Sequence, residues 1–147
     1  MNYWGISMDK YFKANAILSV FSKKYMELKK GLPIRPSEMG VLNILWETPG
    51  PHTPLMLAGM LGVSKSMIAA HLSVLVRKGY VTRQEAREDK RSYYVLITDK
   101  GRELVSHAKG ETSRQLSGMI EQMGQQQFDQ LTALIEEANR YLEGIRE

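Results

Sequence analysis

Hydrophobic residues between Thr53 and Gly79 follow the spacing of two short helices joined by a tight turn. Thr53 can cap the first helix, Pro54 suits its first position, and Gly62 ends it. Ser64 can cap the second helix, in which apolar residues recur every three or four positions. These apolar residues are Ile68, Leu72 and Leu75. The pattern predicts a helix-turn-helix.

The opposite face of the second helix carries side chains that are small, polar or basic. Nothing bulky keeps this face out of a DNA groove, so we interpret the segment as a recognition helix. His71 has two interpretations: a donor to a base or phosphate, or a half-buried histidine beside Leu72. The residues of this helix that we expect at the DNA are Ser64, Lys65, Ser66, Ala69, Ala70, His71, Ser73 and Arg77.

A hairpin pattern follows the second helix. Residues 80–82 and 93–97 are rich in β-branched and aromatic residues, as strands are, and the charged residues 83–92 lie between them. A hairpin with a basic tip directly after a recognition helix predicts a wing. Narrow A·T-rich minor grooves attract cationic side chains, which here are those of Arg87, Lys90 and Arg91.

Further helices are expected on both sides of this unit. Residues 36–47 predict one helix before it, and residues 11–28, 98–123 and 128–145 predict three long amphipathic helices. A winged domain of about 65 residues can bury a core of its own, so we expect a second copy of the chain to cover the long apolar stripes. The predicted fold is mainly α with a small β-wing. Its parts are an amino-terminal dimerisation helix in residues 1–34, a winged helix-turn-helix DNA-binding domain in 35–98 and carboxyl-terminal dimerisation helices in 99–147.

Charge and composition narrow the class of protein. Residues 1–98 hold 14 of the 20 basic side chains and seven of the 16 acidic ones, which favours a polyanion-facing amino-terminal part. The chain has no cysteine, so disulfides and thiolate metal sites are excluded, and a reducing cytoplasm is the expected location. Neither a signal peptide nor a membrane-spanning run is visible.

Several motifs together carry a family resemblance. They are Leu57-Ala58, Val63-Ser64-Lys65-Ser66, Leu75 with Lys78-Gly79, Asp89-Lys90-Arg91 and Ile97-Thr98-Asp99-Lys100-Gly101. With these motifs, the segment from about Ile34 to Leu104 resembles the MarR family of winged-helix transcription regulators. The wing D-x-R followed by T-x-x-G is the most specific part. Ala69-Ala70 departs from the family, many members of which have a hydroxyl and an arginine there.

The resemblance implies a homodimeric transcription regulator, expected to act as a repressor on pseudo-palindromic duplex DNA. Two recognition helices would enter successive major grooves about 34 Å apart. Arg91 would be the minor-groove contact, and Asp89 would orient it through a charge-assisted pair. The alternative for these two residues is a surface ion pair worth roughly 0–1 kcal/mol.

The resemblance also implies a small effector, often aromatic and anionic, bound between the dimer helices and the DNA-binding domain. In this chain an apolar crevice is expected there, although each of its residues also suits an ordinary packed core. The predicted pocket residues are Tyr11, Phe12, Met39, Leu42, Trp46, Leu104 and Ala108.

Other classes of protein fit less well. His107 and Glu111 have a spacing that can place two metal ligands on one helix face, and an ArsR-like metal sensor is one alternative. A winged domain used only for protein contacts is another. No sequence motif of a known enzyme class appears, so we expect neither catalysis nor a cofactor, and no metal.

Overall fold

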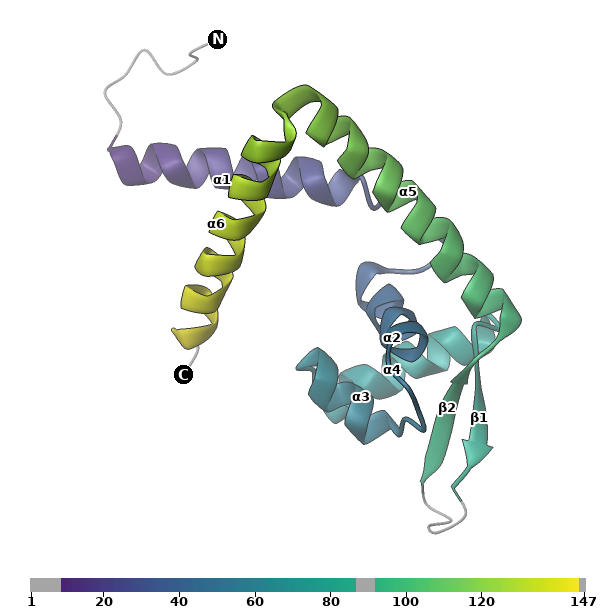
Figure 1. Ribbon diagram of the computed structural model, residues 1–147. Coiled ribbons are helices and arrows are strands. Elements are labelled where there is room, and N and C mark those ends of the chain that lie inside the picture. Colours follow the sequence, from purple (N-terminus) through teal and green to yellow (C-terminus); the bar gives the residue numbers. More distant parts are fainter. Residues whose placement is uncertain (1–8, 87–91, 146–147) are drawn as a thin grey trace.

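A computed structural model describes residues 9–86 and 92–145 (Figure 1). It confirms a mainly α fold with a two-stranded antiparallel wing. The elements in chain order are α1 (Lys10–Glu27), α2 (Pro36–Glu47), α3 (Pro54–Leu61), α4 (Lys65–Arg77), β1 (Val81–Glu85), β2 (Tyr93–Ile97), α5 (Asp99–Met123) and α6 (Gln125–Gly144).

The helix-turn-helix begins and ends where its capping residues predict. The Thr53 hydroxyl accepts a hydrogen bond of 3.2 Å from the backbone N–H of Met56 and caps α3. The Ser64 hydroxyl accepts one of 3.1 Å from the N–H of Met67 and caps α4. Gly62, between the two helices, has a φ of 66°, a left-handed conformation that glycine adopts without the cost of a Cβ.

The first strand of the wing is longer than the sequence pattern indicates. β1 extends to Glu85, which pairs with Tyr93, so the expected tip at residues 83–92 is too long. The error arises because Arg83 and its neighbours have polar side chains, whereas strand pairing uses the backbone. Arg83 also stacks its guanidinium 4.9 Å from the ring centre of Tyr93 across the hairpin.

The hydrophobic core lies in the winged helix-turn-helix domain and is completed by Ile34 before it and by the first turns of α5. Its buried side chains run from Ile34 to Val105, and neither α1 nor α6 contributes a buried residue. The fully buried members include Val41, Leu42, Leu57, Ile68, Leu72, Leu75, Val81, Val95 and Val105. The predicted boundary at residue 98 therefore falls inside the packed unit, because Leu104 and Val105 of α5 belong to the same core.

The three long helices extend away from that core (Figure 1). α5 leaves the base of the wing and α6 folds back from it at Gly124, while α1 crosses α6 and ends beside α5. Apolar side chains stay exposed on these outer helices, for example Leu18 at 65% and Leu134 at 64%. Among the described residues no single helix meets the length and hydropathy of a membrane span; α3 and α4 reach them only as a pair bent by 112°.

Candidate DNA-binding surface and adjoining cavity

The two faces of α4 separate as the sequence predicts. Ile68 and Leu72 are buried against the core, whereas the predicted DNA-facing side chains other than His71 are exposed. Ser64 and Ser66 lie at the start of the helix with their hydroxyl oxygens 3.1 Å apart. Met67, for which the sequence favours packing over DNA contact, is 48% exposed in this first turn. The structure therefore presents a small, polar and basic helix face to the surroundings.

His71 differs from its neighbours on α4. Its side chain is half-buried, and within the described ranges its buried Nε2 atom has no hydrogen-bond partner. This partial burial agrees with the second interpretation, a half-buried histidine beside Leu72.

The predicted contacts at the wing tip lie outside the described residues. They are Arg87, Asp89, Lys90 and Arg91. The hairpin that carries them is described up to Ala86, whose N–H donates to the Ser92 carbonyl at 3.4 Å. The roles of Asp89 and Arg91 stay predictions.

Hydrogen bonds to the backbone fix the carboxyl-terminal end of α4. The Lys78 ammonium donates to the Pro33 carbonyl at 2.8 Å, and the Lys100 ammonium donates to the Lys78 carbonyl at 2.6 Å. The Thr98 hydroxyl donates to the Gly79 carbonyl, also at 2.6 Å. The start of α5 is thereby attached to the end of the recognition helix. The sequence showed these residues only as part of a family motif.

A cavity of about 750 Å³ lies where the end of α1 meets α2 and α5. Of the seven predicted pocket residues, only Met39 and Ala108 line it. Leu42 and Leu104 instead belong to the packed core. Other residues around the cavity are Leu28, Lys29, Asn43, Glu47, Thr112 and Gln115.

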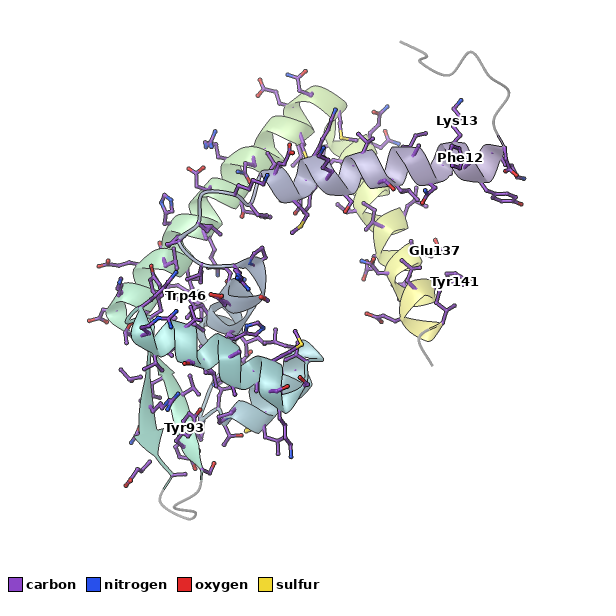
Figure 2. The ribbon with its side chains drawn as sticks, turned by 180° about the vertical axis from the view of Figure 1, so that it is seen from behind. Phe12, Lys13, Trp46, Tyr93, Glu137 and Tyr141 are labelled. Atoms are coloured by element: carbon purple, nitrogen blue, oxygen red, sulfur yellow. The ribbon has the colours of Figure 1, made fainter. Side chains whose placement is uncertain are left out.

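The remaining predicted pocket residues lie elsewhere. Tyr11 and Phe12 are 72% and 59% exposed at the start of α1. Figure 2 shows Phe12 at the outer end of α1, far from Trp46 on α2. Trp46 lies at the end of α2, with the Lys109 ammonium 5.4 Å from its ring centre. The structure therefore does not bring the seven residues together. Helical periodicity shows which face a residue occupies, but not which end of the helix meets the neighbouring domain.

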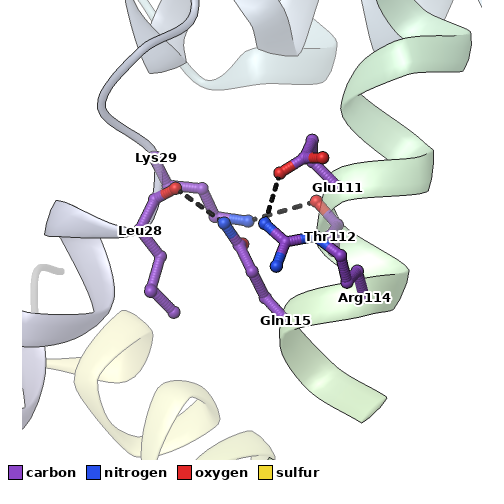
Figure 3. Close-up of polar contacts among 6 residues, drawn as sticks. All are labelled: Leu28, Lys29, Glu111, Thr112, Arg114 and Gln115. Atoms are coloured by element: carbon purple, nitrogen blue, oxygen red, sulfur yellow. Dashed lines mark hydrogen bonds and ion pairs between the residues drawn. The ribbon is translucent and has the colours of Figure 1, made fainter. Parts of the chain in front are cut away.

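Polar contacts join α1 to α5 along one side of the cavity (Figure 3). The Gln115 amide donates to the Leu28 carbonyl at 3.0 Å, and the Lys29 ammonium donates to the Thr112 hydroxyl at 3.5 Å. Across the cavity, Lys109 of α5 pairs with Glu47 of α2. Sequence reasoning missed this polar rim, because its members come from α2, from α5 and from the turn that follows α1.

His107 and Glu111 are the possible metal ligands on α5, and Glu111 forms an ion pair with Arg114. Glu111 bonds the Arg114 guanidinium at 2.7 Å, and this hydrogen bond and charge lower the pKa of Glu111. In the described part of the chain, no group of three histidine, cysteine or acidic side chains gathers in a way that could hold a metal ion.

The outer helices enclose a second, more apolar hollow. It measures about 380 Å³ and lies between α1, α5 and α6. Phe21 and Tyr25 of α1 stack there with ring centres 5.8 Å apart. From the other two helices it is lined mainly by Leu116, Met119, Phe128, Leu131 and Ile135.

Comparisons with known proteins agree with this architecture. The sequence model of the MarR family matches residues 34–93. The Bacillus subtilis protein YkoM, described as an uncharacterized HTH-type transcriptional regulator, is 27% identical over 103 residues, which cover 70% of this chain and 66% of YkoM. The chain thus spans just under two thirds of that relative's length.

Solved structures share the fold over most of the chain. Streptococcus pneumoniae FabT in complex with DNA has a TM-score of 0.78 at 20% identity, covering 92% of this chain and 99% of FabT. The Streptomyces coelicolor regulator PcaV, in complex with its natural ligand, has a TM-score of 0.73 at 17% identity, covering 92% and 97%. With the helix-turn-helix, the wing and the flanking helices in place, residues 34–93 are similar to the MarR family, and the whole chain shares the fold of these solved structures.

Proposed function

We propose that the chain is a homodimeric repressor that binds pseudo-palindromic duplex DNA through α4 and the wing. The exposed, non-bulky face of α4 carries the proposal, because Lys65, Ser66 and Ala70 are exposed on it and no described part of the chain covers them. A dimer would place two such helices about 34 Å apart, one helical turn of DNA. The related fold of FabT was solved in complex with DNA.

The exposed apolar side chains of the outer helices support the dimer. Tyr11, Leu18, Leu134 and Tyr141 are each more than half exposed, on two helices in which none of the described residues is fully buried. Exposed apolar patches of this extent mark interaction sites. A second copy, bringing the same helices, would cover them on both chains at once.

A small aromatic anion is the effector that the cavity beside α2 suits best. The Lys29 and Lys109 side chains supply cationic groups at its rim, and Met39 and Ala108 supply apolar lining. Such a ligand would compete with Glu47 for Lys109. It would release DNA only by favouring a dimer in which the two α4 helices are wrongly spaced. The related fold of PcaV was solved with its natural ligand.

The direct test is fluorescence anisotropy with duplex DNA from upstream of the chain's own coding sequence. We expect tight binding at low salt that weakens steeply as salt rises, since phosphate contacts release counterions. Absence of binding at low salt would contradict the proposal and favour a winged domain used only for protein contacts. Titration of phenolic and aromatic acids into the complex then tests the effector: one of them should release the DNA and change Trp46 emission in a Trp4→Phe background.

A further inference from the structure

Exposed methionine side chains gather in the helix-turn-helix. Met56 and Met60 lie four residues apart on α3, and Met67 lies in the first turn of α4. Their exposed fractions are 48%, 50% and 48%, whereas Met39 in the core is only 6% exposed. The chain has nine methionines and no cysteine, so thioethers are its only sulfur groups.

We infer that Met56, Met60 and Met67 form an oxidation site, and that sulfoxide formation there weakens DNA binding. The inference rests on the proposed function and adds a chemical signal to it. The oxidant class is peroxide or hypohalous acid, to which an exposed thioether is open and a buried one is not.

The chemistry is a two-electron oxygen transfer. A sulfur lone pair attacks one peroxide oxygen and forms the S–O bond while the O–O bond breaks. The departing hydroxide takes the remaining peroxide proton and leaves as water. Sulfur is oxidised and the peroxide is reduced, so no metal or further reductant is required. Methionine sulfoxide reductases reverse the product to the thioether.

Met67 has the position from which this change reaches DNA most directly. Its backbone N–H donates to the Ser64 hydroxyl at 3.1 Å, and its side chain is 48% exposed in the same first turn as the exposed Lys65 and Ser66. A thioether there can make apolar contact with a thymine methyl. A sulfoxide removes that contact and points a partly negative oxygen toward the phosphates.

The two methionines of α3 extend the same effect. The first helix of a helix-turn-helix crosses the DNA backbone. Met56 and Met60 are apolar and exposed on that helix, and oxidation makes both polar. We expect Met67 to account for most of the loss and the α3 pair for the remainder.

Hydrogen peroxide and hypochlorite are the probes, added to the full chain before anisotropy with the duplex described above. The untreated protein must bind first; failure there overturns the proposed function and this inference with it. Oxidised protein should then lose about tenfold in affinity, the size of one lost base contact, and methionine sulfoxide reductase should restore it. Peptide mass spectrometry should show oxygen on Met56, Met60 and Met67.

Matched variants separate this site from general oxidative damage. A triple Met56→Leu, Met60→Leu, Met67→Leu variant should keep its DNA affinity after the same treatment. Met26→Leu removes a methionine of α1 with the same 48% exposure and should leave the oxidation response in place. Equal loss in the triple variant and the parent, or full binding by the oxidised parent, would overturn the inference while leaving the proposed function intact.

Discussion

The ammonium group of Lys100 donates a 2.6 Å hydrogen bond to the backbone carbonyl of Lys78, at the carboxyl-terminal end of the recognition helix. Lys100 also lies over the ring of Tyr80, with its nitrogen 4.7 Å from the ring centre. Lys78 itself reaches the Pro33 carbonyl just before α2. Three segments distant in sequence are thus joined at one point, and any rotation of α5 acts on the orientation of α4.

Lys100→Met tests this junction. The substitution keeps the alkyl chain but removes the donor to the helix end, so the free energy of unfolding should fall by about 1 kcal/mol. Urea denaturation measures it. Arg102→Met changes an exposed residue of the same helix whose side chain makes no hydrogen bond or ion pair in the described structure, and it should leave the unfolding free energy within about 0.5 kcal/mol of the parent. Equal changes in the unfolding free energy of both variants would show that the Lys100 hydrogen bond does not contribute to stability.

Gly101→Ala should be among the most damaging single changes in α5. An added Cβ would overlap the carbonyl oxygen of Tyr80 and lie 2.7 Å from the Cγ1 atom of Ile97. We expect a loss of about 2 kcal/mol or more, since the obstacle includes backbone that cannot move aside. Gly110→Ala, in the same helix with open space around it, should instead stabilise by about 0.5–1 kcal/mol. Thermal unfolding should show a lower melting temperature for Gly101→Ala and a higher one for Gly110→Ala. A melting temperature of Gly101→Ala at or above that of the parent would contradict the close approach at Gly101.

The proposed dimer can be tested with one charge. Leu18→Glu places a carboxylate on the exposed apolar surface of α1, where a partner would bury it unpaired. Dimerisation should weaken by about 3 kcal/mol for each buried charge, and light scattering should report a monomer mass. Leu96→Glu makes the same change on the wing at 41% exposure and should leave the mass unchanged. A Leu18→Glu chain that keeps the parent's dimer mass would place the interface elsewhere.

Lys65→Gln examines the electrostatic part of DNA binding. If Lys65 meets a phosphate, its loss should flatten the slope of log affinity against log salt by about 0.9 for each lost contact, twice per dimer. Lys13→Gln, at the outer end of α1 in Figure 2, removes the same charge away from α4 and should leave the slope unchanged. Parallel slopes for the parent and Lys65→Gln would remove Lys65 from the contact surface.

Local signals were enough to predict the helix-turn-helix. Proline at the first position of α2 and α3, and glycine after α3, mark those ends through backbone geometry alone. The buried and exposed faces of α4 could be predicted from apolar residues that recur every three or four positions, because the core covers only one side of this helix.

Long-range features were not available from the same signals. The extent of β1 depends on its pairing with Tyr93 rather than on the side chains of Arg83 to Glu85. The cavity depends on where the end of α1 meets α5, which places Lys29 beside Thr112 and leaves Phe12 several turns away. Periodicity carries no information about such crossings.

Hydroxyl-radical and methylation footprinting on the upstream duplex tests the central claim, that two copies of α4 read DNA as a pair. We expect two protected major-groove sites with centres about 10 base pairs apart, related by approximate two-fold symmetry. Both should disappear together in Leu18→Glu at a protein concentration that saturates the parent. A single protected site, or protection that spreads evenly along the duplex, would contradict it.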